Sequence, residues 1–175
     1  LCNASPAADT AVALLALNAR VFLESVDQKR ILSLDEFFVG PGKTVLKPGE
    51  ILTKIQVPIP PSTQSGCFLK LGRRSAFTLS IVSVAVAVQL RDAAFRSVRI
   101  ALGAVAPTPI RARRAEECLL AKRAEASVIE EASAMAAGAA SPVSDVRASA
   151  VYRKDMCRVL TRRALRSCLN SPPAP

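Results

Sequence analysis

The chain has 175 residues, of which 50% are hydrophobic and 22% are charged, so its composition is that of a folded globular protein and excludes a disordered one. It carries 24 Lys and Arg against 14 Asp and Glu, a net charge of +10, and no His. Without His, the chain cannot form triads, general bases or metal sites that need an imidazole. The longest apolar run, residues 81–88, is too short to cross a bilayer, so we expect no transmembrane segment.

The five cysteines are spread along the chain, without the close spacing of a zinc or iron–sulfur ligand set. Their odd number also argues against the disulfide framework of a small secreted domain. We therefore expect free thiols, no metal site in this chain and a reducing, cytoplasmic location. The cysteines are Cys2, Cys67, Cys118, Cys157 and Cys168.

The first unit is expected over residues 1–63. Ser5 and Pro6 are residue types that start helices, Ser as the cap and Pro at the first helical position, and this helix should end near Asn18. A turn between two short strands, one helical turn and a further strand should follow. These elements are expected at residues 20–25, 30–34, 35–38 and 51–57.

A stretch rich in Pro, Ser and Gly, residues 58–66, leads into a second unit over residues 64–170. Here the pattern changes from Val- and Ile-rich strands to helices, which predicts the α+β class. The strands are expected at residues 68–71, 79–90 and 98–105, and the helices at residues 113–120, 124–137 and 148–169. The Pro-rich tail, residues 171–175, is predicted to be disordered.

The positive charge gathers at residues 111–114 and 153–166. The second stretch has the spacing of an amphipathic helix with a basic outer face, which suits either solvent or an acidic partner subunit. If a partner docks there, reversing the charge at Arg158 and Arg162 should weaken the association. We expect no nucleic-acid partner, because the chain has no Trp and a single Tyr to stack on bases.

Two residues point to a ligand. Asp9 lies in the first turn of the predicted helix, where free N–H groups and the positive end of the dipole attract anions, and its carboxylate can accept a hydrogen bond from a hydroxyl. An ordinary capped helix gives the same pattern. Lys70 lies among apolar residues of a predicted strand, from which it reaches either a bound anion or solvent. No nucleophile–base pair, paired carboxylates or glycine-rich nucleotide loop occurs, so no catalytic residue is assigned.

Five segments carry a family resemblance. They include Asn3-Ala-Ser-Pro-Ala-Ala-Asp9, Phe68-Leu-Lys70 and the run from Ala101 to Pro107, and they span residues 3–10, 37–52, 68–74, 101–112 and 142–153. In this order they resemble the FAD-binding medium subunits of molybdenum hydroxylases, the family of the carbon monoxide dehydrogenase and xanthine dehydrogenase flavoproteins. The first segment resembles the stretch that follows the family's Gly-Gly-Asn flavin-pyrophosphate loop.

The resemblance implies a fold. Residues 1–63 would be the C-terminal part of a vanillyl-alcohol-oxidase-like FAD-binding subdomain, with mixed or antiparallel strands and a helix. Residues 64–170 would be the flavoprotein C-terminal domain, a three-stranded antiparallel sheet packed on a three-helix bundle. The family's two glycine-rich pyrophosphate loops are expected before Leu1, so the chain would be N-terminally truncated relative to the family.

The resemblance also implies a function as the flavoprotein subunit of a multi-subunit oxidoreductase. FAD would pass electrons from the 2Fe-2S clusters of a small subunit to NAD or another acceptor, and a large subunit would hold molybdopterin. Asp9 matches a residue that contacts FAD, Leu52 one whose backbone approaches the flavin, and Lys70 a lysine at the cofactor; Ser5 would donate near the phosphates. Where many members have Asp-Ile-Ala, this chain has Thr78-Leu-Ser80. The alternative is a basic docking module without bound flavin.

Overall fold

The computed structural model describes residues 1–74 and 77–170. The predicted tail at residues 171–175 lies outside this part. The helices are α1 (Asp9–Ala16), η1 (Leu34–Glu36, one 3-10 turn), α2 (Arg113–Leu119), α3 (Ala126–Ala139) and α4 (Ala150–Asn170). The strands are β1 (Arg20–Glu24), β2 (Lys29–Ser33), β3 (Phe38–Gly40), β4 (Lys43–Thr44), β5 (Ile51–Gln56), β6 (Gln64–Leu71), β7 (Val82–Arg91), β8 (Ala94–Gly103) and β9 (Ile110–Arg111).

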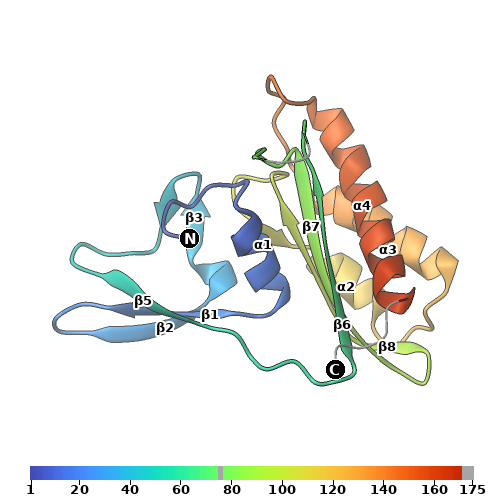
Figure 1. The fold of residues 1–175 in the computed structure, drawn as a ribbon, viewed down its shortest axis with the longest axis horizontal. Coiled ribbons are helices and arrows are strands. Elements are labelled where there is room, and N and C mark those ends of the chain that lie inside the picture. Colours follow the sequence, from blue (N-terminus) through green and yellow to red (C-terminus); the bar gives the residue numbers. More distant parts are fainter. Residues whose placement is uncertain (75–76, 171–175) are drawn as a thin grey trace.

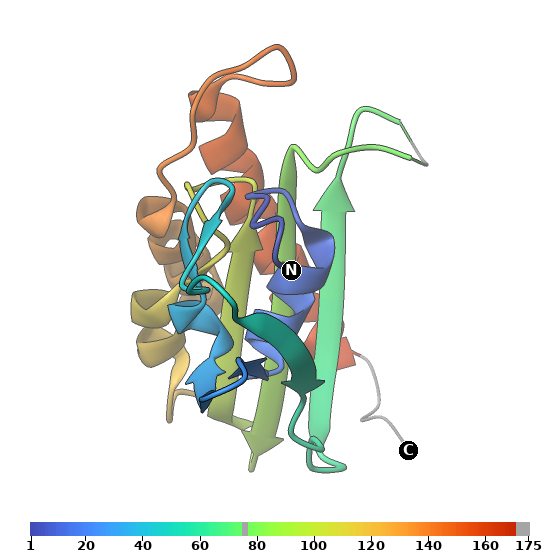
Figure 2. The same cartoon turned by 90° about the vertical axis from the view of Figure 1, so that its left-hand side faces the viewer.

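The large sheet, in the strand order β6-β7-β8-β9, forms the middle layer of the molecule (Figure 1). Helices α2, α3 and α4 cover one face of this sheet, and α1 packs on the other (Figure 2). Beyond α1 lies the small sheet β2-β1-β5. The pairings within both sheets are antiparallel, which confirms the predicted α+β class.

The two faces of β7 and β8 differ in side-chain size because successive residues of a strand point to opposite faces. The face toward α2, α3 and α4 carries large residues, which join the main hydrophobic core. The opposite face carries small ones: Ala85 pairs with Ala101, and Ser83 pairs with Gly103. Both alanines belong to a second hydrophobic cluster, together with Ala11, Val12, Leu15 and Ala16 of α1.

Gly103 marks the closest approach of α1 to the sheet. A Cβ atom at this position would collide with the side chains of Val12 and Ser83. The absence of a side chain at Gly103 therefore allows α1 to pack directly on β8.

The segment that leads into α1 is held by two loops, one of which is supported by α4. The Gly42 N–H donates to the Ala4 carbonyl at 3.0 Å, and the Ala104 N–H donates to the Pro6 carbonyl at 2.8 Å. Arg153 of α4, which is buried, donates through Nη1 to the carbonyls of Ala104 at 3.0 Å and Ile81 at 2.9 Å. The last helix thus supports the loop that holds the start of the chain.

Asp145 completes this support. One of its oxygens, Oδ1, accepts from Arg153 Nη2 at 2.7 Å, and the other accepts from the Arg147 guanidinium at 2.6 Å. The Arg147 guanidinium and backbone N–H, followed by Arg153 and the Ala148 N–H, hold the pKa of Asp145 well below its ordinary value. The carboxylate therefore stays ionised and paired throughout the neutral range.

The predicted helix start at Ser5 and Pro6 is wrong. α1 begins at Asp9, and its N-cap is Ala8, which makes no side-chain capping bond. Ser5 Oγ instead accepts from the Ala7 N–H at 3.3 Å, inside a turn. Because the Pro6 carbonyl accepts from Ala104, a tertiary contact takes the group that a helical bond would use.

The expected strands and helices of the second unit are present, with one addition. The short strand β9 pairs with Ala101 and Leu102, so the predicted sheet of three strands has a fourth. β9 directly follows the Pro107-Thr-Pro109 pattern, which reads as loop in the sequence. The placement of a domain boundary between residues 63 and 64 stays a prediction; the chain between β5 and β6 belongs to no helix or strand.

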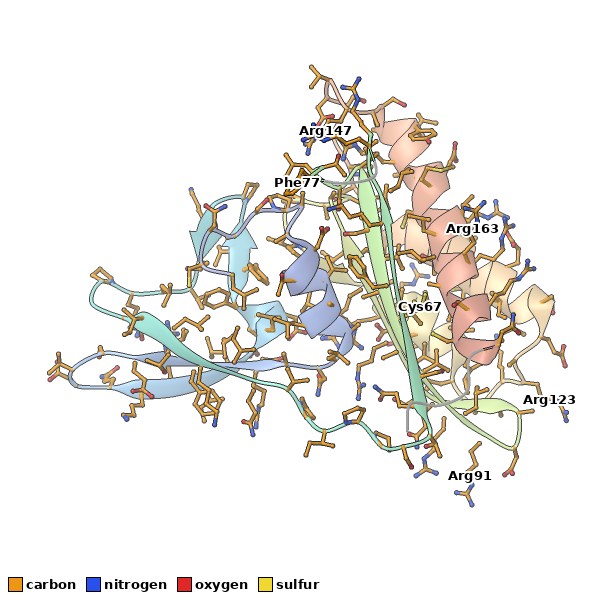
Figure 3. All side chains as sticks on the ribbon, viewed as in Figure 1. Cys67, Phe77, Arg91, Arg123, Arg147 and Arg163 are labelled. Atoms are coloured by element: carbon orange, nitrogen blue, oxygen red, sulfur yellow. The ribbon has the colours of Figure 1, made fainter. Side chains whose placement is uncertain are left out.

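Arg158 and Arg162 of α4 share an acidic partner on α3. Arg158 Nε donates to Glu130 Oε1 at 2.8 Å, and Arg162 Nη1 donates to Glu130 Oε2 at 3.1 Å. Reversing their charge would therefore disturb the packing of α4 on α3. Arg163 lies on the exposed side of α4 and is the better position for a docking test (Figure 3).

All five cysteines have free thiols. Burial raises the pKa of both Cys157 and Cys168 to about 12, so these two remain protonated and behave as small apolar side chains. None of the helices in residues 1–74 and 77–170 combines the length and the apolar character that a bilayer crossing needs.

The Gly103→Ala substitution should lower the free energy of unfolding by about 2 kcal/mol, because the added methyl group forces α1 away from the sheet. Gly138→Ala is the matched control. Gly138 lies in α3, and a Cβ there meets nothing within 4 Å, so this change should raise stability by about 1 kcal/mol. Chemical denaturation of both variants measures the two effects; equal changes would contradict the close packing of α1.

The stability contributed by Asp145 should depend on pH. Folding lowers the pKa of Asp145. Its contribution to stability is therefore complete above the ordinary pKa of 3.8 and is lost as the pH falls below that value. Asp145→Asn should lower Tm at pH 7, and the difference from the unmodified protein should shrink as the pH falls through 4 toward 2. Asp92→Asn, at an exposed turn, should leave Tm unchanged at both ends of the series. A difference for Asp145→Asn that does not vary with pH would contradict this account.

Candidate functional site

The two charged residues that the sequence singles out are in contact. Lys70 Nζ lies 2.5 Å from Asp9 Oδ2, and the Ser80 hydroxyl donates to Asp9 Oδ1 at 2.5 Å. Asp9 is the first residue of α1, Lys70 lies in β6, and Ser80 precedes β7. We call these three residues the Asp9 cluster. It forms where the packing of α1 on the large sheet brings its first turn to β6 and β7.

Lys70 points toward α1 because of the alternation along β6. Cys67, Leu69 and Leu71 pack against the main core beside the helices. Lys70 has the opposite orientation and pairs with Ser83, which faces α1. The Lys70 ammonium therefore pairs with a carboxylate of the protein. The sequence alone indicates either a bound anion or solvent as its partner.

The Asp9 cluster has unused hydrogen-bonding capacity at the protein surface. The side chains of Asp9 and Lys70 are 34% and 29% exposed. A carboxylate offers about four lone-pair sites and an ammonium three donors, and the contacts within the cluster use two of the former and one of the latter. The cluster can therefore accept from ligand hydroxyls and donate to ligand carbonyl or phosphate oxygens.

A cavity of about 360 Å³ is lined in part by residues that are close to Asp9 and Ser80 in the sequence. One side is formed by the turn at Ser5 and by Leu79, the residues that lead into Asp9 and Ser80. Most of its remaining wall is apolar, and the charged group of Asp145, Arg147 and Arg153 lines part of it. Figure 3 shows Arg147 and Phe77 at the same end of the molecule. The cavity has the size and the mostly apolar lining of a small-molecule site.

Ser5 and Leu52 do not join the Asp9 cluster. Ser5 lies at the cavity, where its hydroxyl serves the local turn. Leu52 lies in β5 opposite Leu23 of β1, and a β-bulge follows where Lys54 pairs with Phe22. β5 is the outer strand of its sheet, so within the described residues one edge of its backbone has no strand partner. Leu52 therefore lies on an edge strand, whose outer backbone groups are open to a ligand.

Ser80 is the residue that sequence reasoning missed as part of a site. It is completely buried, yet its hydroxyl reaches the half-exposed carboxylate of Asp9. The only signal in the sequence is its departure from the Ala of the family pattern. Within residues 1–74 and 77–170, no group of three or more Cys, Asp or Glu side chains is arranged to hold a metal ion.

Comparison with known proteins assigns both parts of the chain. Residues 1–60 match the family described as "FAD binding domain in molybdopterin dehydrogenase", and residues 68–168 match the "CO dehydrogenase flavoprotein C-terminal domain". The chain is 32% identical to the glyceraldehyde dehydrogenase medium chain of Sulfolobus acidocaldarius, over 94% of this chain and 58% of that protein. It is 29% identical to the carbon monoxide dehydrogenase medium chain of Afipia carboxidovorans, over 93% of this chain and 56% of that protein.

A solved structure shares the fold. It is the carbon monoxide dehydrogenase of Hydrogenophaga pseudoflava that lacks the Mo-pyranopterin moiety of its molybdenum cofactor, with a TM-score of 0.94 and 28% identity. The match covers 99% of this chain and 60% of that chain. The chain thus spans a little over half the length of the relatives that it matches. On these matches, the chain belongs to the family of FAD-binding medium subunits of molybdenum hydroxylases, as the sequence motifs indicate.

Proposed function

We propose that this chain is part of the FAD-binding, electron-transfer subunit of a molybdenum-containing hydroxylase or dehydrogenase. In this role, bound FAD would link the 2Fe-2S clusters of a small subunit to NAD or another electron acceptor. A large subunit holds molybdopterin, and the complex lies in the cytoplasm, where the five thiols remain reduced. The observation that carries the proposal is the Asp9 cluster. It brings Asp9, from the part that matches the FAD-binding family, into contact with Lys70 and Ser80, from the part that matches the C-terminal domain family.

The chemistry of the cluster fits FAD. The cofactor presents ribityl and ribose hydroxyls, ring carbonyls and a pyrophosphate. The Asp9 carboxylate has free lone pairs for hydroxyl donors, and the Lys70 ammonium has free N–H groups for carbonyl or phosphate oxygens. The cavity lined by Ser5 and Leu79 would supply apolar surface.

Four residues would hold the cofactor. Asp9 would accept from a hydroxyl, Lys70 would donate to an oxygen and offset negative charge, and the outer edge of β5 at Leu52 would offer backbone groups. Ser5, at the cavity, would take a supporting polar contact. FAD exchanges electrons singly or in pairs, which is the chemistry that a link between iron–sulfur clusters and a two-electron acceptor requires.

The protein contributes orientation and electrostatics. In the structure Lys70 is paired with the Asp9 carboxylate, which places its charge at the partly exposed cluster. The family matches support partners of the kind named in the relatives, where the medium chain is one subunit of a larger enzyme. No residue of this chain is assigned to the hydroxylation step itself.

The proposal is tested on the natural full-length protein, purified together with the subunits that co-elute. Its visible absorption spectrum should show flavin bands. Asp9→Ala and Lys70→Ala should each raise the FAD dissociation constant by about tenfold or more, because each removes a charged hydrogen-bonding partner. Titration of the flavin-free protein with FAD measures these constants.

Asp27→Asn is the control, because Asp27 lies in the exposed turn between β1 and β2. It should leave the dissociation constant unchanged. A full-length protein that neither contains nor binds flavin would overturn the proposal and leave the basic docking module as the function. Unchanged affinity in both the Asp9 and Lys70 variants would remove the cluster from the site.

A further inference from the structure

We propose that Ser80 is a positioning residue of the cofactor site, which fixes the orientation of the Asp9 carboxylate; this inference rests on the proposed FAD site. The Asp9 carboxylate is held at both oxygens by different parts of the fold. Ser80 Oγ donates to Oδ1 at 2.5 Å, and Lys70 Nζ lies 2.5 Å from Oδ2. With both oxygens held, the carboxylate cannot turn about its Cβ–Cγ bond without breaking one of these contacts.

The two contacts differ in their exposure to water. The Lys70 and Asp9 side chains are 29% and 34% exposed, so their ion pair competes with water and dissolved ions. Ser80 has no exposed surface. The hydroxyl of Ser80 therefore makes the better shielded contact, and it decides where Oδ1 lies when Lys70 turns toward a ligand.

Ser80 can serve as a fixed donor because the following residue is anchored. The Ile81 N–H donates to the Leu71 carbonyl at 2.8 Å, at the end of β6. The Ile81 carbonyl accepts from the buried Arg153 at 2.9 Å. The N–H and the carbonyl of Ile81 are thus bonded to β6 and α4, and this restricts the movement of the neighbouring Ser80 side chain.

This arrangement has a chemical consequence for the ligand. Ser80 occupies one lone pair of Oδ1, so the remaining lone pairs of the carboxylate are held at defined positions. A carboxylate fixed in this way selects a hydroxyl donor of defined direction, such as one on the polyol chain of FAD. Ser80 needs no contact with the cofactor for this effect.

The test compares Ser80→Ala with Ser83→Ala in the full-length protein. Both serines are completely buried, but the Ser83 hydroxyl has no hydrogen-bond partner within the described residues. Ser80→Ala should raise the FAD dissociation constant by about tenfold, because binding must then order a carboxylate that Ser80 no longer holds. Ser83→Ala should change it by less than about twofold, because no hydrogen bond is lost there. The visible circular dichroism of the bound flavin should change only in the Ser80 variant.

Two further variants separate positioning from simple packing. Ser80→Cys fills the space of the hydroxyl with a weak donor, so its loss of affinity should match that of Ser80→Ala. In an Asp9→Ala background, Ser80→Ala should cause no further loss, because its effect passes through the carboxylate.

Each outcome has a defined meaning. Three results would overturn the role of Ser80 but leave the FAD site in place. They are recovery of FAD affinity in Ser80→Cys, equal losses of affinity in Ser80→Ala and Ser83→Ala, and additive losses when Ser80→Ala is combined with Asp9→Ala. Unchanged affinity in Asp9→Ala itself would overturn the Asp9 site and, with it, the role of Ser80.

Discussion

The close packing of α1 on the small-residue face of β7 and β8 is the constraint on which the site depends. Ala85, Ala101 and Gly103 leave room for the helix, so the Val12 side chain on its hydrophobic face packs directly against Gly103. Larger residues at these positions would still bury apolar surface, but they would move α1 away from the sheet. The first turn of α1 would then no longer reach Lys70 in β6 or Ser80 before β7. Packing geometry, more than local charge, thus determines which polar groups meet.

A second set of contacts orients the chain before α1. The carbonyl of Pro6 is held by Ala104, and the carbonyl of Ala104 is held by Arg153. A guanidinium suits this task because it is always charged and donates in several directions from one plane. Its buried charge is balanced by Asp145, which is itself fixed by Arg147. A carboxylate–guanidinium network in the C-terminal part therefore sets the path of the N-terminal segment.

Much of the fold follows from the sequence because the patterns are local. The hairpin of β1 and β2, the long strands β7 and β8, and the helices α2, α3 and α4 all lie close to the predicted ranges. The start of α1 could not be predicted, since a hydrogen bond from a residue almost one hundred positions away overrides the helix signal at Ser5 and Pro6. Asp9 and Lys70 could be singled out as charged residues in unusual settings, but their contact is a product of tertiary packing. Ser80 has no charge and no motif, so only the assembled structure reveals it.

The contacts of Asp9 also bear on the order in which the chain becomes structured during synthesis. Its two partners follow it by 61 and 71 residues, and Arg153 lies further still toward the C-terminus. As the ribosome releases the chain, the helix that carries Asp9 emerges long before the strands on which it rests. The large sheet and α4 must therefore form before α1 can settle, and contacts between such distant residues form slowly. A chaperone or a partner subunit that binds the nascent chain would meet α1 with its apolar face still uncovered.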